Sequence, residues 1–307
     1  MENSIVKIEH LSHRYSVQWA VRDINIDITR NGIYGLLGSN GAGKSTTMNI
    51  VCGVLKQTEG NVYIKGINLK DNPVEAKKHL GFLPQKPPLQ GDLTVEEFLS
   101  YVANVRQVPR DQVKQAVSEV LERCGITHFR KRLIRNLSGG YQQRVGIAQA
   151  IIHKPEFVVL DEPTNGLDPN QILEVRHLIK NIAEERTVIL STHILSEVQA
   201  ICDHIYMIEQ GRLVFSGTVE EFDSYIVPNT LKVKMLAMPT VEELKAIPDL
   251  IRAEDLGGGN YRLYFPSAEE AMEQVVETSV ARGWRLTTQN LEKCSMDEIF
   301  AELSKKR

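Results

Sequence analysis

Several features are missing from this chain of 307 residues, and each absence excludes a class of protein. No uncharged apolar run reaches the roughly 18–20 residues that a membrane-spanning helix needs. The first ten residues lack the apolar core of a signal peptide, so we expect no secretion signal. The net charge is −3, which gives no global basic field, and we therefore expect no nucleic-acid partner.

Cysteine is also scarce. The four cysteines, Cys52, Cys124, Cys202 and Cys294, are scattered along the chain and match no metal-binding spacing. They are typical of reduced packing thiols in a cytosolic protein. Hydrophobic residues make up 42% and charged residues 24%, as in ordinary soluble globular proteins. The length allows about two domains.

The stretch GSNGAGKST fits the phosphate-loop pattern G-x-x-x-x-G-K-[ST]. Its residues are Gly38, Ser39, Asn40, Gly41, Ala42, Gly43, Lys44, Ser45 and Thr46. Glycines let backbone N–H groups turn inward around a phosphate chain, where a Cβ would block the approach. Lys44 should reach the β- and γ-phosphates, and the Ser45 hydroxyl should ligate Mg²⁺. A predicted strand over 32–37 and a predicted helix over 45–55 flank the loop, with the helix N-terminus toward the phosphates.

Two further apolar runs end in polar residues. Residues 156–161 predict a strand buried on both faces, and it ends at Asp161 and Glu162. Because ligands of parallel sheets collect at the carboxyl ends of strands, one acid can hold Mg²⁺ through water and the other can orient the attacking water. A second buried strand is predicted over 186–193, and it ends at His193, which is either structural or a hydrogen-bond donor to a γ-phosphate.

Three other positions have two interpretations each. Tyr15 lies between two predicted strands and either stacks on a base or packs at a sheet edge, and spacing alone favours packing. Gln85 ends a predicted strand beside a loop with two prolines, and it either reaches a metal or is solvated. The basic cluster between residues 130 and 135 is either a solvated face or, less favoured, a contact with lipid or a partner.

The segment NLSGG precedes a predicted helix that runs to about residue 153. Ser138 is a plausible N-cap, and Gly139 and Gly140 beside it expose backbone N–H groups. A helix N-terminus with free donors is an anion site. Nothing nearby in the sequence supplies an anion, so this site is expected to serve another chain.

The order of predicted elements indicates two domains, over residues 1–227 and 228–307. Within the first, the mostly helical stretch from about 88 to 155 interrupts the strand–helix rhythm and is interpreted as an inserted subdomain. The second has the order β-α-β-β-α-β-α, which suggests a small ferredoxin-like unit. It carries no ligand constellation, so a packing or dimer-supporting appendage is favoured over a sensor domain.

The phosphate loop, LSGG, VVLDEP, GLD and STH follow one another in that order over about residues 4–225. Together they resemble the ATP-binding subunit of ABC transporters. The resemblance implies an α/β P-loop NTPase cassette, with a RecA-like parallel sheet, an N-terminal antiparallel β part and an inserted helical subdomain. The run from Tyr141 to Asp203 is similar to an exporter-type subgroup that includes drug, sodium and gliding-motility ATPases.

The resemblance also implies roles for residues. Tyr15 stacks on adenine, and residues 38–46 grip the phosphates, with Lys44 among the catalytic groups. Gln85 senses Mg²⁺ and the attacking water, and it lies near the coupling helix of a membrane partner. Asp161 binds Mg²⁺ through water, and Glu162 acts as base or positions the water. His193 contacts the γ-phosphate. Asp168 belongs to a loop that contacts the opposite subunit.

By the same resemblance, Ser138, Gly139 and Gly140 cap a γ-phosphate held by the opposite subunit. Two copies, or one copy and a paralogous ATPase, would sandwich two ATP molecules and drive a separate permease from the cytoplasmic face of the membrane. Two residues depart from the common pattern. Tyr141 stands where Gln is common, which puts a contact to the opposing ribose in doubt, and Ser39 stands where Pro is frequent.

A rival hypothesis is a soluble mechanical ABC ATPase that acts on ribosomes or DNA. The ribosomal group usually carries two cassettes and a charged linker, and the DNA-repair group carries a long coiled-coil insertion; this chain has neither. A third hypothesis, a nucleotide-gated regulator without catalysis, is disfavoured because a mere binder needs neither Glu162 nor His193.

Overall fold

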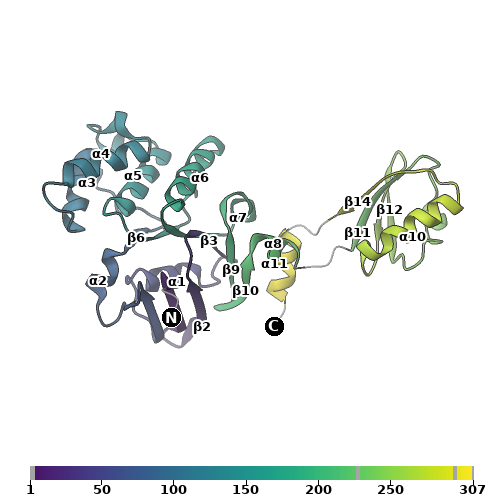
Figure 1. Cartoon of the computed structure of the whole chain (residues 1–307), viewed down its shortest axis with the longest axis horizontal. Coiled ribbons are helices and arrows are strands. Elements are labelled where there is room, and N and C mark those ends of the chain that lie inside the picture. Colours follow the sequence, from purple (N-terminus) through teal and green to yellow (C-terminus); the bar gives the residue numbers. More distant parts are fainter. Residues whose placement is uncertain (1–3, 226–228, 293–295, 306–307) are drawn as a thin grey trace. The chain divides into compact units, whose positions relative to one another are not determined.

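The computed structural model describes residues 4–225, 229–292 and 296–305 of the chain (Figure 1). The chain divides into two compact units, Met1–Val219 and Glu220–Arg307. The predicted domain boundary between residues 227 and 228 falls within 226–228, outside the described residues. Within the described ranges, every helix is too short or too polar to cross a membrane.

A parallel sheet forms the centre of the large unit, and its strands lie in the order β10-β9-β3-β8-β7-β6. These strands are β3 (Gly32–Leu37), β6 (Leu80–Leu83), β7 (Phe157–Asp161), β8 (Thr187–Thr192), β9 (His204–Glu209) and β10 (Arg212–Thr218). Only β10 runs antiparallel, against β9. Every residue of β7 and β8 is buried, which explains the apolar runs Phe157–Leu160 and Val188–Leu190 at their centres.

A second sheet of the large unit is antiparallel, in the order β2-β1-β4-β5. Its strands are β1 (Val6–Tyr15), β2 (Gln18–Ile28), β4 (Glu59–Ile64) and β5 (Ile67–Asn68). Burial alternates toward the end of β2, as expected for a strand with one face on a core. The predicted parallel core and antiparallel N-terminal part are therefore confirmed.

Helices cover the central sheet and form a separate block (Figure 1). The helices that begin in the large unit outside this block are α1 (Lys44–Val51), α2 (Pro73–Lys78), α6 (Pro169–Ala183), α7 (Leu195–Ile201) and α8 (Val219–Asp223). Of these, α8 ends in the small unit. The block holds α3 (Val95–Val105), α4 (Val113–Arg123), α5 (Gly139–Ile151) and the short 3₁₀ turns Thr127–Phe129 and Ile134–Asn136. A capping box begins α3: the Thr94 Oγ1 accepts from the Glu97 backbone N–H at 3.3 Å. The next helix, α4, begins at Val113 after its N-cap Gln112.

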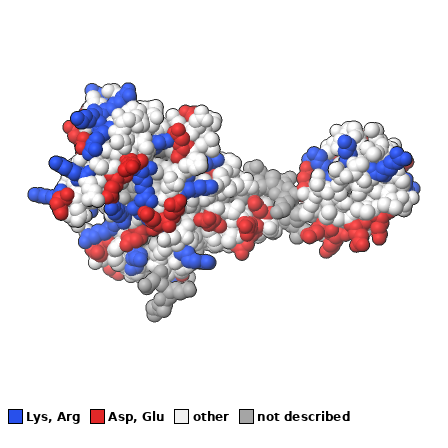
Figure 2. Space-filling model, turned by 45° about the horizontal axis from the view of Figure 1, so that its top comes forward, with Lys and Arg blue, Asp and Glu red and all other residues white. Residues whose placement is uncertain are grey.

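The small unit is an antiparallel sheet in the order β12-β13-β11-β14. Its elements are β11 (Thr230–Met235), α9 (Val241–Leu244), β12 (Arg252–Gly257), β13 (Asn260–Tyr264), α10 (Ala268–Ala281), β14 (Leu286–Glu292) and α11 (Met296–Lys305). This strand order is the ferredoxin-like one that the element order predicts. Acidic side chains gather along one side of this unit in the view of Figure 2.

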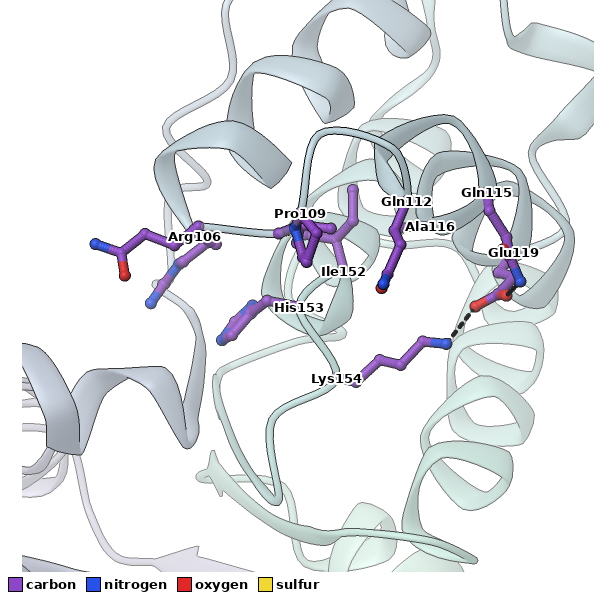
Figure 3. A pocket seen from close by; sticks show the side chains of 11 residues that line it. Arg106, Pro109, Gln112, Gln115, Ala116, Glu119, Ile152, His153 and Lys154 are labelled. Atoms are coloured by element: carbon purple, nitrogen blue, oxygen red, sulfur yellow. Dashed lines mark hydrogen bonds and ion pairs between the residues drawn. The ribbon is translucent and has the colours of Figure 1, made fainter.

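A cavity of about 210 Å³ lies in the helical block, where the α3–α4 loop and α4 meet the end of α5 (Figure 3). Its charged groups already have partners. The Lys154 ammonium lies 2.7 Å from the Glu119 carboxylate, and the Arg106 Nη1 donates to the backbone oxygen of Lys77 at 3.3 Å. None of the predicted nucleotide-site residues lines this cavity.

One cavity residue, His153, is largely buried, and its Nε2 lies 3.1 Å from the backbone oxygen of Leu80. Burial, aided by the charge of Arg106, lowers the pKa of His153 to about 4. Between about pH 6.5 and pH 4 the unfolded chain therefore binds a proton that the folded chain does not, so folding becomes less favourable as the pH falls. We expect the free energy of unfolding to drop through this window by up to about 3 kcal/mol. Urea denaturation of the full chain at a series of pH values measures the drop.

The variant His153→Gln is the control, since glutamine does not titrate and should flatten this part of the pH dependence. An equal slope in wild type and variant would assign the loss of stability to other groups.

Candidate nucleotide site

The phosphate loop lies between the end of β3 and the start of α1, and its glycines are required by close contacts. A Cβ on Gly38 would lie 2.1 Å from the backbone oxygen of Ile208. A Cβ on Gly43 would lie 2.7 Å from the Val21 Cγ1, and Gly43 has φ +110°. The loop is thus packed against β9 and β2. A side chain at either of these two positions would collide with its neighbours, so only glycine fits there.

Lys44 is 5% exposed and folds back over the loop. Its Nζ donates to the backbone oxygens of Gly38 at 2.9 Å and Ser39 at 3.0 Å. Burial lowers the pKa of Lys44, while the carboxylates of Glu162 and Asp161 oppose this shift. A partly desolvated cation at the mouth of a phosphate loop is suited to attract a phosphate chain.

Ser39, which departs from the common pattern, has a contact of its own. Its hydroxyl donates to the Glu209 Oε1 at 2.7 Å, and its backbone N–H donates to the Glu209 Oε2 at 3.3 Å. Proline could make neither bond, because it lacks both the hydroxyl and the N–H. The serine therefore ties the loop to the end of β9.

Asp161 ends β7 and is buried. Burial raises the pKa of its carboxyl group, and hydrogen bonds from the hydroxyls of Ser191 and Ser45 lower it in part. The helix that follows the phosphate loop and the end of β7 thus bring a hydroxyl and a carboxylate together. Oxygen ligands of this kind suit Mg²⁺, which takes few protein ligands and otherwise binds water and phosphate oxygens.

Glu162, the next residue, is where three predicted site residues meet. The Gln85 Nε2 donates to the Glu162 Oε2 at 2.6 Å, and the His193 Nδ1 lies 3.4 Å from the Glu162 Oε1. Gln85 follows β6 and His193 follows β8, the strands on either side of β7. The backbone of Glu162 is left-handed, with φ +49°, which costs energy for a residue other than glycine and is common at functional sites.

Sequence reasoning missed two residues that hold these acids. The Asn165 Nδ2 donates to the Glu162 Oε2 at 3.0 Å. The Ser191 hydroxyl accepts from the Glu162 backbone N–H at 3.1 Å and donates to the Asp161 Oδ1. Both residues stand within recognised segments, but an isolated serine in a strand or asparagine in a turn has no sequence signal that marks such a contact.

Ser138 is the N-cap of α5, as predicted, but its side chain makes no capping hydrogen bond. Ser138 and Gly139 are exposed, whereas Gly140 is buried with no room for a Cβ, which would lie 2.5 Å from the Gln171 Cδ. Asp168 is the N-cap of the adjacent helix α6, and its Oδ1 accepts from the Gln171 backbone N–H at 2.9 Å. In the described parts of the chain, no hydrogen bond or ion pair joins Ser138 to the phosphate loop.

Tyr15 and Tyr141 lie in different surroundings. Tyr15 is the last residue of β1 and is 53% exposed. Its ring contacts the His13 ring edge-on, with the ring centres 4.7 Å apart. The Tyr141 ring packs inside the helical block, with its centre 4.5 Å from that of Phe129 and with the Arg144 guanidinium above it. The departure from Gln at position 141 thus supplies packing within this chain.

This arrangement defines a P-loop nucleotide-hydrolysing cassette, with a phosphate loop, a metal-suited acid and a second acid beside a glutamine and a histidine. Residues 21–165 match the family described as "ABC transporter". The chain is 41% identical, over 214 residues and 69% of each chain, to the bacitracin transport ATP-binding protein BcrA of Bacillus licheniformis. It is 29% identical, over 98% of each chain, to the linearmycin resistance ATP-binding protein LnrL of Bacillus subtilis.

A solved structure is similar too, the dimeric post-hydrolysis state of the ATP-binding cassette MJ0796 bound to ADP and Pi. It has a TM-score of 0.64 and 25% identity, and the match covers 70% of this chain and 98% of that one. The chain belongs to the ATP-binding proteins of ABC transporters and is an ATPase.

The close contact at Gly38 makes a prediction about the loop. In Gly38→Ala the new Cβ meets the backbone oxygen of Ile208, so we expect the free energy of unfolding to fall by about 1–3 kcal/mol and ATP binding to weaken. Urea denaturation and titration with a fluorescent ATP analogue measure the two effects. The matched control is Gly139→Ala, whose Cβ meets nothing within 4 Å and which should fold as the wild type does. Equal stability of all three proteins would contradict the prediction.

Proposed function

We propose that two copies of this chain, or one copy and a paralogous ATPase, close head to tail around ATP and so drive a separate membrane permease, as part of an exporter. The observation that carries this proposal is the division of the site. The groups suited to bind phosphate and water surround Glu162. The hydrogen-bond donors at Ser138 lie exposed at the start of another helix, α5, where the Ser138 side chain makes no capping hydrogen bond. A second chain placed head to tail would bring one set to the other.

Within one chain, the residues fit Mg–ATP. The exposed Tyr15 ring offers a face for adenine, and the loop from Gly38 to Thr46 offers backbone N–H groups and Lys44 to the phosphates. Ser45, Asp161 and Gln85 would hold Mg²⁺, directly or through water, and the ion would neutralise charge on the phosphates. The hydroxyl of Ser45 already meets the Asp161 carboxylate, which supports this donor set.

Hydrolysis requires a group that aligns water and accepts its proton. Glu162 is the residue we assign, because its two oxygens already bind the Gln85 amide and lie near the His193 imidazole. His193 would contact the γ-phosphate, and Gln85 would respond to its presence. Lys44 would exchange its two backbone carbonyl partners for phosphate oxygens.

The opposite chain would complete the site. Ser138, Gly139 and Gly140 would cap the γ-phosphate with a hydroxyl and N–H groups at the start of α5. Asp168 starts α6 beside them, so the two helix starts would reach the partner together. The similar cassette MJ0796 is described as dimeric, which supports this assembly.

A permease partner and export are supported by the relatives, one of which is named for bacitracin transport and another for linearmycin resistance. The large unit also has exposed apolar side chains around the end of α1, α2 and the end of α3, and these are Val54, Val74, Tyr101 and Val105. Two hydrogen bonds hold these segments together, from the Lys77 Nζ to Gly53 and from the Arg106 Nη1 to Lys77. We assign this apolar surface to the permease, which would hold the chain at the cytoplasmic face of the membrane.

The variant Glu162→Gln tests the proposed chemistry. Glutamine keeps the shape but cannot accept a proton, so we expect ATP hydrolysis to fall at least about 100-fold while ATP still binds. Because ATP is bound but not hydrolysed, the closed dimer should accumulate when Mg–ATP is added, and light scattering should detect its larger mass. Lys44→Ala in the same background should lose the dimer, because it weakens phosphate binding. A monomer at saturating ATP in Glu162→Gln would count against the sandwich.

A second test concerns the helix start that would act across the dimer. In the Glu162→Gln background, Ser138→Ala removes a hydroxyl proposed to bind a charged phosphate, and the ATP-dependent dimer should weaken about tenfold. Binding of ATP to the monomer should be unchanged. Equal dimer affinity with and without the hydroxyl would remove Ser138 from the interface.

The apolar surface makes a prediction about the permease. Val105→Asp places a charge on that surface, so a multi-span membrane protein that copurifies with wild type in mild detergent should be lost, while ATP binding is kept. The matched control is Val280→Asp, another exposed valine, on α10 of the small unit. If Val105→Asp retained the membrane protein, the permease would contact another part of the chain. Copurified ribosomal or DNA-repair proteins would favour a soluble mechanical ATPase.

A further inference from the structure

Glu197 is a buried carboxylate that the proposed chemistry does not use. It lies in the first turn of α7 and is 2% exposed. The Thr164 hydroxyl donates to its Oε1, and the Thr192 hydroxyl donates to its Oε2 at 2.6 Å. Both threonines are buried as well. Each carboxylate oxygen therefore takes a hydroxyl from a different segment of the chain.

The two segments carry the residues assigned to hydrolysis. Thr164 stands two residues after Glu162, in the turn that leads to Asp168, and its backbone oxygen accepts from the Leu167 N–H at 3.3 Å. Thr192 directly precedes His193, and its hydroxyl also accepts from the Ile194 backbone N–H at 3.0 Å. The backbone on both sides of His193 is thus tied to the carboxylate that holds the turn after Glu162.

Stability alone is a poor reason for this arrangement. Within residues 4–225, no ion pair compensates the Glu197 carboxylate, and a buried charge costs free energy unless its hydrogen bonds are well made. Apolar residues of similar volume would usually pack as stably. What the carboxylate provides, and an apolar group cannot, is a fixed spacing between two loops.

We propose that Glu197 is a positioning residue for ATP hydrolysis, which sets the His193 loop against the turn from Glu162 to Asp168. The inference rests on the proposed roles of Glu162 and His193. Their side chains lie 3.4 Å apart in the single chain, a spacing that small shifts of either loop would change. Misplacement of such groups lowers the rate of the chemical step more than it weakens substrate binding.

The test uses the full chain and four variants. Thr164→Val and Thr192→Val each remove one hydroxyl at nearly constant volume, and Glu197→Gln replaces one of the two acceptor oxygens by an NH2 group, which can only donate. Thr192→Ser keeps the hydroxyl and is the matched control. Steady-state hydrolysis of Mg–ATP gives kcat and KM, and the stoichiometry of a bound fluorescent ATP analogue gives the folded fraction by which kcat is divided.

We expect kcat per binding site to fall about tenfold or more in the first three variants, with KM for ATP changed by less than about threefold. Thr192→Ser should stay near wild type. A merely structural role predicts fewer binding sites with normal kcat per site, and that result overturns the proposal. Equal losses for Thr192→Ser and Thr192→Val overturn it as well.

Two further measurements separate this inference from the proposed function. Glu162→Gln and His193→Ala serve as benchmarks: normal hydrolysis in them would overturn the roles of Glu162 and His193 themselves. If the benchmarks are inactive and the Glu197 variant is normal, only the positioning role fails. In the Glu162→Gln background, Thr164→Val should also weaken the Mg–ATP-dependent dimer, because Asp168 follows the displaced turn; an unchanged dimer would contradict the connection to Asp168.

Discussion

The parallel pairing of β8 between β3 and β7 is the constraint on which the site depends. The three strands are far apart in sequence, yet their carboxyl ends meet at one edge of the sheet. There β3 leads into the phosphate loop, β7 ends in Asp161 and β8 leads to His193. Because β7 and β8 are buried on both faces, a slip in their register would disrupt the close packing on both sides of the sheet.

Hydrogen bonds between neighbouring strand ends then refine the positions that the sheet sets. Ser191 on β8 contacts both acids at the end of β7, and the buried Glu197 carboxylate joins the turn after β7 to the end of β8. Gln85 reaches Glu162 from the other side of β7. The acid assigned to hydrolysis is therefore supported from three directions, and its strained backbone is held by a rigid surround.

The helical block shares one hydrophobic core with a face of the central sheet, whereas the small unit has a core of its own. In the block, Tyr141 shows how a departure from a common motif is accommodated, since its ring packs on Phe129 next to the exposed start of α5. The small unit has the sheet order of a ferredoxin-like fold and an outer helix, α10, with four exposed glutamates at Glu269, Glu270, Glu273 and Glu277.

The sequence by itself determined the elements and the residue types of the site. Short apolar runs at Phe157–Leu160 and Val188–Leu190 predicted β7 and β8, the glycine pattern predicted the phosphate loop, and the order of predicted elements over residues 228–307 predicted the small unit. These signals are local, because strand periodicity and glycine conformations depend on neighbouring residues.

Only the tertiary structure decided which side chains meet. Gln85, Glu162 and His193 come from three segments, and their contact exists because the sheet places β6, β7 and β8 side by side. The roles of Asn165, Ser191 and Glu197 were invisible in the sequence, since a hydroxyl, an amide or a carboxylate has no periodic pattern and gains its partner only through folding. Long-range contacts of this kind depend on strand order, which no local signal encodes.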